Sequence, residues 1–392
     1  MATKPTALIV GAGIGGLAAA IALRRAGWAV RVFERASSPR ELGFALLLAP
    51  NAMHALARAR PCRNGPPGRL RNDERRDATS RWDGPPPVRD RRDSEPCSTK
   101  IRSASCVQSC MARCSMPPAL NPIELAAEAI GFASTADRVE LRLANGKTAA
   151  GDILIGADGV GSLIRRQLHP AEDAPRPSGL LAIRGVARDV VRHLGNSSGA
   201  QHFGRGLEAG VVRASEHEVL LVSVDSRRLG RHVPRCVDAR RTLRCRISRT
   251  VPRDRQCDST RGSSTRRAVR ARPDSTAAGM GPVTLLGDAA HPMLPHAGQG
   301  AAQALEDAVT LGSVMKESGR RSSNRDAALR RYEELRAPRT RAVIEVARRN
   351  ARMGSMTSAA GCWVRDQVIR FIPQSVITEV ARRVGQSSEV IC

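Results

Sequence analysis

Apolar residues near the N-terminus fall into short runs separated by a glycine-rich turn. Thr6–Val10 predicts a buried strand, and Leu17–Ala26 predicts a helix that ends at Gly27. Val30–Phe33 predicts a second strand, which closes on Glu34. Strand, turn, helix and strand follow one another in the order of a parallel βαβ unit.

Similar patterns continue along the chain, where short apolar or alternating runs predict strands and Ala-rich runs predict helices. The expected strands are Val139–Leu143, Asp152–Ala157, Leu180–Val186, Ala209–Arg213, Val219–Val224 and Val283–Leu286. The expected helices are Glu124–Ala133, Ala301–Leu311 and most of Tyr332–Ile391. In this tail, a basic face is expected to lie in solvent; it comprises Arg336, Arg339, Arg341, Arg348 and Arg349.

Two segments break the pattern. Residues 58–118 carry 13 Arg and residues 227–275 carry 16, and neither segment shows a helical or strand period. Together they supply most of the formal net charge of +26 and eight of the ten Cys. So few apolar side chains cannot offset the entropy of ordering, so both blocks are expected to be poorly ordered. Their composition also matches the out-of-frame reading of a GC-rich gene.

The turn after the first strand reads Gly11-Ala12-Gly13-Ile14-Gly15-Gly16, a pattern typical of dinucleotide binding. Gly11 permits the tight turn, Gly13 lets the backbone approach a pyrophosphate, and Gly16 lets the helix pack closely on the strand. Glu34 lies 23 residues after Gly11, where an acid accepts a hydrogen bond from a ribose hydroxyl. The alternative is a signal peptide, whose apolar region is shorter and needs no such glycines.

Two further strands end on acidic turns. Asp152–Ala157 runs into Asp158, and Val283–Leu286 runs into Gly287-Asp288. The carboxyl ends of parallel strands share one edge of a sheet, where ligands bind, so both Asp side chains are expected near the glycine turn. The alternative for each is ordinary turn and N-cap chemistry. The histidines that follow, His291 and His296, are either structural loop residues or proton-transfer groups.

Together these motifs resemble the single-component FAD-dependent aromatic hydroxylases, flavoprotein monooxygenases similar to salicylate and hydroxybenzoate hydroxylases. The resemblance rests on Gly11–Gly16 with Glu34, Ile155–Gly159, and Leu286–Pro292 with Gly298-Gln299-Gly300. Glu41-Leu42-Gly43 and Pro50-Asn51-Ala52 also look like the family's stretch after the second strand. The likeness covers about residues 1–57, 123–225 and 279–350.

The resemblance implies a role for each matching residue. The ADP half of FAD would be held by Gly11, Gly13, Gly15, Gly16 and Glu34. Asp158 lies in a motif that serves both FAD and NADPH in the family. Asp288 would hydrogen-bond the ribitol of FAD, and the backbone from Gly298 to Gly300 would lie near the flavin ring.

The chemistry implied is hydroxylation of an aromatic or similar small ring, with FAD as cofactor and NAD(P)H and O2 as co-substrates. NAD(P)H would dock transiently, and no catalytic residue is assigned. In the family an Arg that touches the flavin is expected within 100–120, where Gln108–Cys114 lacks the pattern. The alternative function is therefore a catalytically impaired flavin-fold remnant.

The expected fold is α/β, with a parallel-sheet, Rossmann-like FAD domain interleaved with a mixed β-sheet substrate domain and a helical C-terminal tail. The FAD domain is assigned to 1–57, 119–170 and 276–331, the substrate strands to 171–226, and the C-terminal helices to 332–392. Residues 58–118 and 227–275 are the Arg-rich blocks.

Other functions have weaker support in the sequence. Arg pairs in the second block could bind polyanions, but no reader motif or interleaved aromatics accompany them, so no specific nucleic acid is expected. Cys97, Cys106, Cys110 and Cys114 lack the partners of a zinc site, so no metal is expected. No apolar run is a clean membrane span, and a cytoplasmic location is expected.

Overall fold

The computed structural model describes residues 4–38, 46–48, 50–59, 100–102, 123–188, 199–213, 218–226, 264–270, 278–318, 324–373, 375–376 and 379. Four expectations fall largely or wholly outside these residues. They are the order of the two Arg-rich blocks, the flavin-contacting Arg within 100–120, the Glu41-Leu42-Gly43 match and the four clustered cysteines.

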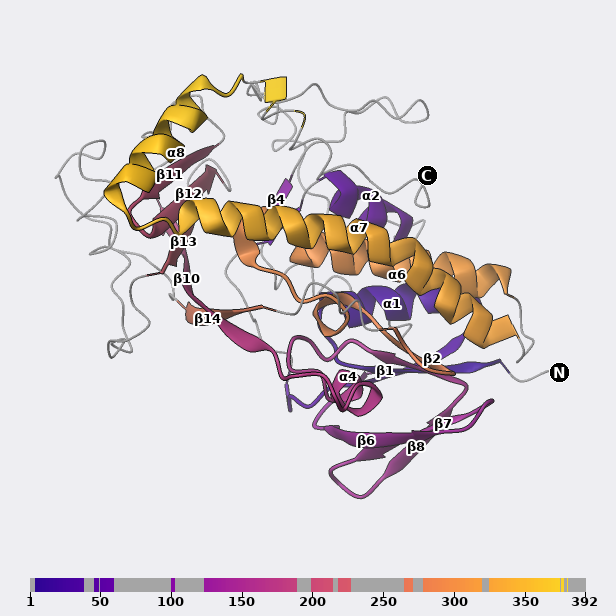
Figure 1. Ribbon diagram of the computed structural model, residues 1–392. Coiled ribbons are helices and arrows are strands. Elements are labelled where there is room, and N and C mark those ends of the chain that lie inside the picture. Colours follow the sequence, from indigo (N-terminus) through magenta and orange to yellow (C-terminus); the bar gives the residue numbers. More distant parts are fainter. Residues whose placement is uncertain are drawn as a thin grey trace.

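A five-stranded parallel sheet lies between a layer of helices and a smaller sheet (Figure 1). Its order is β15-β9-β1-β2-β5, with bounds β15 (Val283–Leu285), β9 (Ile153–Gly156), β1 (Thr6–Val10), β2 (Ala29–Phe33) and β5 (Ile123–Glu124). Leu8 and Ile9 of the central strand are fully buried on opposite faces. Burial on both faces explains why the central strands β1 and β9 are continuous apolar runs rather than alternating ones.

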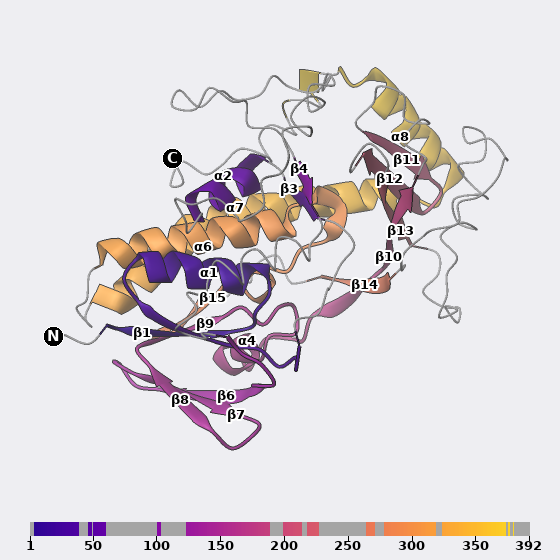
Figure 2. The ribbon, with the colours of Figure 1, turned by 180° about the vertical axis from the view of Figure 1, so that it is seen from behind.

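Helices cover one face of this sheet (Figures 1 and 2). They are α1 (Ile14–Arg25), α2 (Pro50–Ala59), α6 (Gly300–Glu317) and α7 (Arg325–Gly354). The apolar side chains of α1 and α6 meet Ile9 and Ile155 of the sheet in the largest core cluster. Gly312 lies so close to Ala22 that a Cβ atom there would be 2.7 Å from the Ala22 methyl group, which shows how closely α6 packs on α1.

The other face is covered by a three-stranded antiparallel sheet and a short helix. The elements are β6 (Ala129–Ser134), β7 (Val139–Leu143), β8 (Thr148–Gly151) and α4 (Leu163–Leu168). Leu8, Leu141 and Leu154 share the core between the two sheets.

The helix expected at Glu124–Ala133 is wrong. Glu124 ends strand β5, Ala126 adopts a positive φ of 52° in the turn that follows, and β6 begins at Ala129. Ala and Glu favour helix as isolated residues, but β6 pairs with the strongly alternating β7 and buries Phe132 against the core. Tertiary pairing therefore overrides local propensity.

A second sheet of five strands has only antiparallel pairings among the described residues. Its order is β11-β12-β13-β10-β14, with bounds β11 (Gly199–Gly204), β12 (Leu207–Arg213), β13 (Glu218–Asp225), β10 (Arg176–Arg188) and β14 (Ser264–Arg270). β14 lies within the second Arg-rich block, where no strand was expected. An edge strand is held by main-chain hydrogen bonds to one neighbour, here β10, and this pairing needs no alternating apolar pattern.

Helix α7 connects the two sheets (Figure 1). Near its start, Arg325 is 2.7 Å from Asp152 beside the parallel sheet, and its end at Gly354 approaches Glu208 of β12. The remaining elements are β3 (Leu46–Leu48), β4 (Lys100–Arg102), which lies in the first Arg-rich block, the 3-10 turns η3 (Gly287–Ala289) and η4 (Pro295–Ala297), and α8 (Ala359–Phe371). Among the described helices, none combines the length and apolarity needed to cross a bilayer.

Candidate functional site

The glycine turn follows β1 at the carboxyl edge of the parallel sheet. Gly11 has a φ of 103°, a left-handed conformation that other residues rarely adopt, and a Cβ there would strike the carbonyl oxygen of Ala157. A Cβ at Gly16 would strike the carbonyl oxygen of Gly11 itself. These two positions therefore need glycine for the turn and for close packing of α1 on the sheet, as the motif predicts.

Gly13 differs from its neighbours because nothing lies within 4 Å of a Cβ built there. It is the N-cap residue of α1, with no side-chain cap and no acidic residue in the first turn. The N–H groups of a helix's first turn have no intrahelical partner and carry the positive end of the helix dipole. The turn therefore offers open space and positive potential where a pyrophosphate would lie.

Glu34 directly follows β2, and its side chain turns back toward the glycine turn. Its Oε2 accepts a hydrogen bond from the Ala12 N–H at 2.8 Å, and its Oε1 accepts one from the Ala36 N–H at 2.9 Å. A carboxylate oxygen has a second lone pair, so the side chain can also accept from a ribose hydroxyl.

Asp158 follows β9 and accepts hydrogen bonds at the start of helix α4, whose N-cap residue is Ser162. Its Oδ1 accepts from the Ser162 hydroxyl, and its Oδ2 accepts from the N–H of Leu163 at 2.7 Å and more weakly from Ile164. This is the N-cap chemistry that the sequence left open as the alternative. Asp158 is beside the glycine turn, but its carboxylate already has these partners.

Asp288 follows β15 in the turn η3, and its side chain is exposed. Its Oδ1 would lie 3.8 Å from a Cβ on Gly300, so the third motif and the Gly298–Gly300 turn lie side by side. Gly298 has a φ of 63°, and α6 then begins at Gly300 with no acidic residue in its first turn. The structure thus gathers every residue predicted for the cofactor at one edge of the sheet.

This arrangement fits FAD. The open space at Gly13 suits a pyrophosphate, Glu34 lies at the end of the neighbouring strand, and the exposed Asp288 beside Gly300 provides an acceptor for a polyol. FAD bound there would supply the redox chemistry, taking electrons from NAD(P)H and reacting with O2.

The third motif comprises Leu286–Pro292 and Gly298–Gly300. A buried ion-pair cluster lies beneath its two turns. Arg336 of α7 is 2.6 Å from Glu306 through Nη1 and 2.6 Å from Asp307 through Nε. All three side chains are at most 4% exposed. Burial alone raises the pKa of Asp307, but the charges and hydrogen bonds of His291 and Arg336 hold that pKa well below its usual range.

The cluster contacts both turns. Asp307 Oδ2 accepts a hydrogen bond from the Gly287 N–H at 2.9 Å and lies 2.6 Å from Nε2 of His291. Glu306 accepts from the amide of Asn51, which also donates to the side chain of Gln299 at 2.9 Å. This contact fits the structural loop role, one of the two roles considered for His291 from the sequence.

This cluster was not predicted from the sequence, and one of its members was misplaced. Arg336 was expected on a solvated basic face, yet it is 3% exposed. A pair of adjacent acids within a largely apolar helix, Glu306-Asp307, is the signal that could have predicted a buried ion pair. Such carboxylates are buried only when paired, and the long basic helix that follows supplies the partner.

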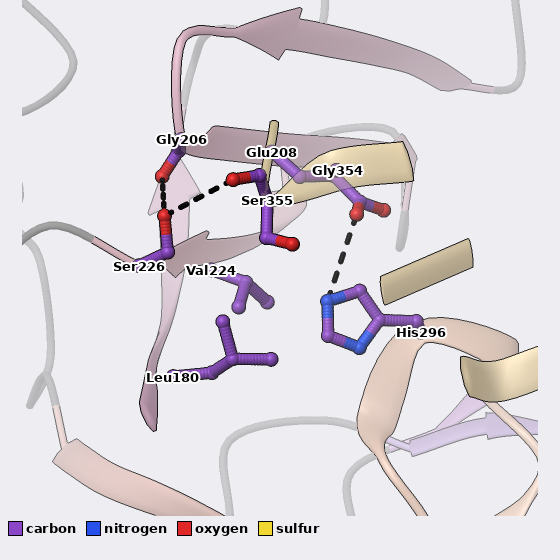
Figure 3. Close-up of a pocket in the computed structure, with 8 residues that line it drawn as sticks. All are labelled: Leu180, Gly206, Glu208, Val224, Ser226, His296, Gly354 and Ser355. Carbon is purple, nitrogen blue, oxygen red and sulfur yellow. Dashed lines mark hydrogen bonds and ion pairs between the residues drawn. The ribbon is translucent and has the colours of Figure 1, made fainter. Parts of the chain in front are cut away.

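A small pocket lies between the antiparallel sheet, η4 and the end of α7 (Figure 3). The lining residues are Leu180, Gly206, Glu208, Val224, Ser226, His296, Gly354 and Ser355. His296 Nε2 is 3.7 Å from Glu208 Oε2, with side-chain exposures of 1% and 10%. Because η4 immediately precedes Gly298–Gly300, the pocket adjoins the turn predicted to lie near the flavin ring.

Burial shifts the pKa values of the two titratable side chains of the pocket, His296 and Glu208. Desolvation lowers the pKa of His296 to about 4, so this imidazole is neutral at neutral pH. Desolvation raises the pKa of Glu208, against smaller opposing effects from its hydrogen bond with Gln201 and the charge of Arg365. The sequence singled out His296 but gave no sign of Glu208, because nothing local in the strand marks an inward-facing acid.

No cluster of three or more His, Cys, Asp or Glu suited to a metal ion occurs among the described residues. The cysteines weighed for zinc lie outside the described part of the chain.

Comparison with known proteins agrees with this geometry. The sequence profile of the FAD binding domain family matches residues 4–347. The chain is 31% identical to the aurachin C monooxygenase/isomerase of Stigmatella aurantiaca over 98% of both proteins. It is 30% identical to the 3-hydroxybenzoate 6-hydroxylase of Klebsiella oxytoca, over 92% of this chain and 91% of the relative. The fold resembles Klebsiella pneumoniae HpxO complexed with FAD and uric acid, with a TM-score of 0.74, 22% identity and 98% coverage of both chains.

Proposed function

Because this chain belongs to the family of FAD-dependent flavoprotein monooxygenases that includes hydroxybenzoate hydroxylases, we propose that it uses NAD(P)H and O2 to hydroxylate a small aromatic or heteroaromatic ring. The observation that carries the proposal is the convergence of three distant motifs on one sheet edge around the open space at Gly13. Packing does not require glycine at position 13, since a Cβ at Gly13 would meet nothing.

The chain's own residues then have distinct tasks. The turn from Gly11 to Gly16 would bind the pyrophosphate through its backbone, Glu34 would accept from the adenosine ribose, and Asp288 would accept from the ribitol. The Gly298–Gly300 turn and the N-terminus of α6 would lie beside the flavin ring. Asp158 contributes mainly by holding α4 and its loop in place.

The buried cluster of Arg336, Glu306 and Asp307 keeps the two turns of the third motif in position. Asp307 holds the Gly287 N–H and His291, while Glu306 reaches Gln299 through Asn51. A fixed turn matters because a displacement of about 1 Å at a reacting centre costs roughly a hundredfold in rate.

The test is the absorbance spectrum of the purified protein, followed by NADH or NADPH oxidation in the presence of candidate ring compounds. A flavin spectrum with product formed in proportion to NAD(P)H consumed supports the proposal. A flavin spectrum with NAD(P)H oxidised but no hydroxylated product would instead indicate the impaired remnant that the Arg-rich blocks suggest. A protein that carries no FAD and cannot be loaded with it would exclude the enzyme and indicate a flavin-fold remnant that binds little or nothing.

A further inference from the structure

Helix α8 packs on the antiparallel sheet, beyond the end of α7 (Figure 1). It is fixed there by Arg365, whose side chain is buried. The guanidinium donates to the main-chain carbonyls of Gly204 at 3.1 Å and Met353 at 3.4 Å. It also lies 5.2 Å from the ring centre of Phe203 in β11. These contacts determine which side of α8 faces the protein.

The side of α8 that faces solvent is apolar. Its exposed large apolar side chains are Trp363 at 65%, Val364 at 52%, Val368 at 52% and Phe371 at 76%. The last three follow the i, i+4, i+7 spacing of one helix face, and Trp363 flanks them. We call these four residues the α8 face.

The α8 face reverses the usual orientation of a surface helix. Such a helix normally buries its apolar stripe against the protein, but the residues that α8 buries are Cys362 and Arg365. Rotating α8 to bury the stripe would remove Arg365 from its buried acceptors, which is costly for a charged group. The exposed apolar face is therefore part of the fold.

Exposed apolar side chains are concentrated on and just after α8. Of the nine large apolar residues that are exposed in the described part of the chain, five lie between Trp363 and Val376. The whole chain has three Trp, one Tyr and five Phe, and one Trp and one Phe are exposed on this helix. Contiguous apolar surface of this kind marks a contact with a protein or a membrane.

The charges beside the α8 face are mostly positive. From Arg348 to Pro373 the chain has five Arg and one Asp. Arg370 on α8 is exposed, as is Arg352 near the end of α7. The acid is Asp366, which pairs with Arg365. The surface therefore combines an apolar face with an excess of cations.

This combination fits the surface of an anionic bilayer. Helices that lie in such a surface have aromatic and aliphatic residues on one face, with basic residues beside them. A second copy of the chain is a poorer partner. A two-fold interface places the same patch against itself, so it would bring two sets of arginines together.

We propose that the α8 face docks on a bilayer that contains anionic lipids, with Trp363 and Phe371 among the acyl chains and Arg370 at the headgroups. Helix α8 has 13 residues, fewer than the roughly 20 that span a membrane, so it lies in the plane of the surface. Because Arg365 binds Gly204 at the end of β11, the contact holds the antiparallel sheet against the membrane.

Flotation of the full-length protein with lipid vesicles tests the proposal. The vesicles are phosphatidylcholine alone, or phosphatidylcholine and phosphatidylglycerol in equal amounts. We expect the mixed vesicles to bind at least about tenfold more tightly, because only they attract the arginines. The net charge of +26 attracts anionic vesicles to any side of the molecule, so the decisive comparison is between variants of equal charge.

The double variant Trp363→Gln, Phe371→Gln keeps every charge and removes the two aromatic side chains of the α8 face. It should bind the mixed vesicles at least about tenfold more weakly than wild type, the usual effect of losing the burial of a large apolar side chain. Ile130→Gln, Met280→Gln is the matched control. These residues are 58% and 67% exposed on β6 and in the turn before β15, so their replacement should leave binding unchanged.

Fluorescence quenching shows whether Trp363 enters the bilayer. The quencher is phosphatidylcholine brominated on its acyl chains, added to the mixed vesicles. We expect it to quench wild-type fluorescence more than that of Trp363→Phe, which keeps an aromatic ring and stays bound. This measurement decides the proposal even if the double variant does not fold.

Equal binding of the wild type and the double variant would overturn the proposal, because charge alone would then account for the affinity. Equal quenching of the wild type and Trp363→Phe would also overturn it. Sedimentation velocity examines the other occupant. A wild-type dimer that dissociates in the double variant, with no binding of wild type to either vesicle, would assign the α8 face to a second copy and exclude the lipid contact.

Discussion

Nε of Arg336 lies 2.6 Å from Oδ1 of Asp307, although the two residues belong to different helices. The same guanidinium also pairs with Glu306, so one cation from α7 neutralises two adjacent buried acids of α6. Since Asp307 holds the Gly287 N–H, this pair links the long C-terminal helix to the turn that carries Asp288.

Replacement of Arg336 by Met should destabilise the protein strongly. It removes the cation closest to two buried carboxylates, Glu306 and Asp307, and breaking a buried pair costs about 3–5 kcal/mol. Urea unfolding followed by circular dichroism measures the loss. Arg331→Met is the control: Arg331 lies on the same helix in an exposed pair with Glu334, and its loss should change the free energy of unfolding by less than about 1 kcal/mol. Similar losses in the two variants would contradict the role given to the buried pair.

Gly13→Asp should abolish FAD binding without preventing folding. The Cβ of the new side chain meets nothing in the protein, but its carboxylate would occupy the space of the pyrophosphate and repel it. Flavin content after purification and the thermal midpoint are the two measurements. Gly16→Ala should instead lower the thermal midpoint, because its Cβ strikes the carbonyl of Gly11. Stoichiometric FAD retained by Gly13→Asp would refute the assignment of this turn.

Asp288→Ala should weaken FAD more than Asp158→Ala does. Asp288 is exposed beside Gly300, and loss of a charge-assisted hydrogen bond lowers affinity roughly tenfold to a hundredfold. Asp158 accepts hydrogen bonds at the start of α4, so its removal should instead cost about 0.5–2 kcal/mol of stability. Titration of the apoprotein with FAD, together with unfolding curves, separates the two effects. Equal and negligible losses of affinity would mean that both residues serve only their turns.

Burial of His296 should make the protein less stable in mild acid. The pKa of His296 is lowered from 6.5 to about 4 in the folded state, so the unfolded chain binds a proton between these values and the folded protein does not. The stability associated with this residue is therefore present above pH 6.5 and decreases as the pH falls toward 4, by up to about 1.4 kcal/mol per pH unit. The raised pKa of Glu208 acts in the opposite direction.

The difference between wild type and His296→Gln isolates this contribution. Glu208, Gln201 and Arg365 are present in both proteins, so their titration is largely common to the two curves. Unfolding free energies measured at several pH values should converge as the pH falls from 6.5 to 4. Parallel curves would show that His296 is protonated equally in the folded and unfolded states.

Local patterns in the sequence were sufficient to predict most strands of the parallel sheet and the glycine turn. Every strand of the parallel sheet except β5 was predicted, because strands buried on both faces are continuous apolar runs. The glycine turn was also predicted, because Gly11 and Gly16 are each needed for a local reason: a left-handed φ at Gly11, and close packing on its carbonyl at Gly16. Matching strand ends then placed Glu34, Asp158 and Asp288 at one edge of the sheet.

Only the tertiary structure decided which polar side chains are buried and with which partner. Arg336 resembles its solvated neighbours in sequence, and its burial follows from the packing of α7 on α6 over the third motif. Glu208 lies on a strand of the antiparallel sheet and His296 in the turn η4, so no local pattern joins them. The same holds for Glu124–Ala133, where pairing with β7 decided against helix. The free energy of a buried charge or a paired strand depends on distant residues, and the fold alone brings those residues into contact.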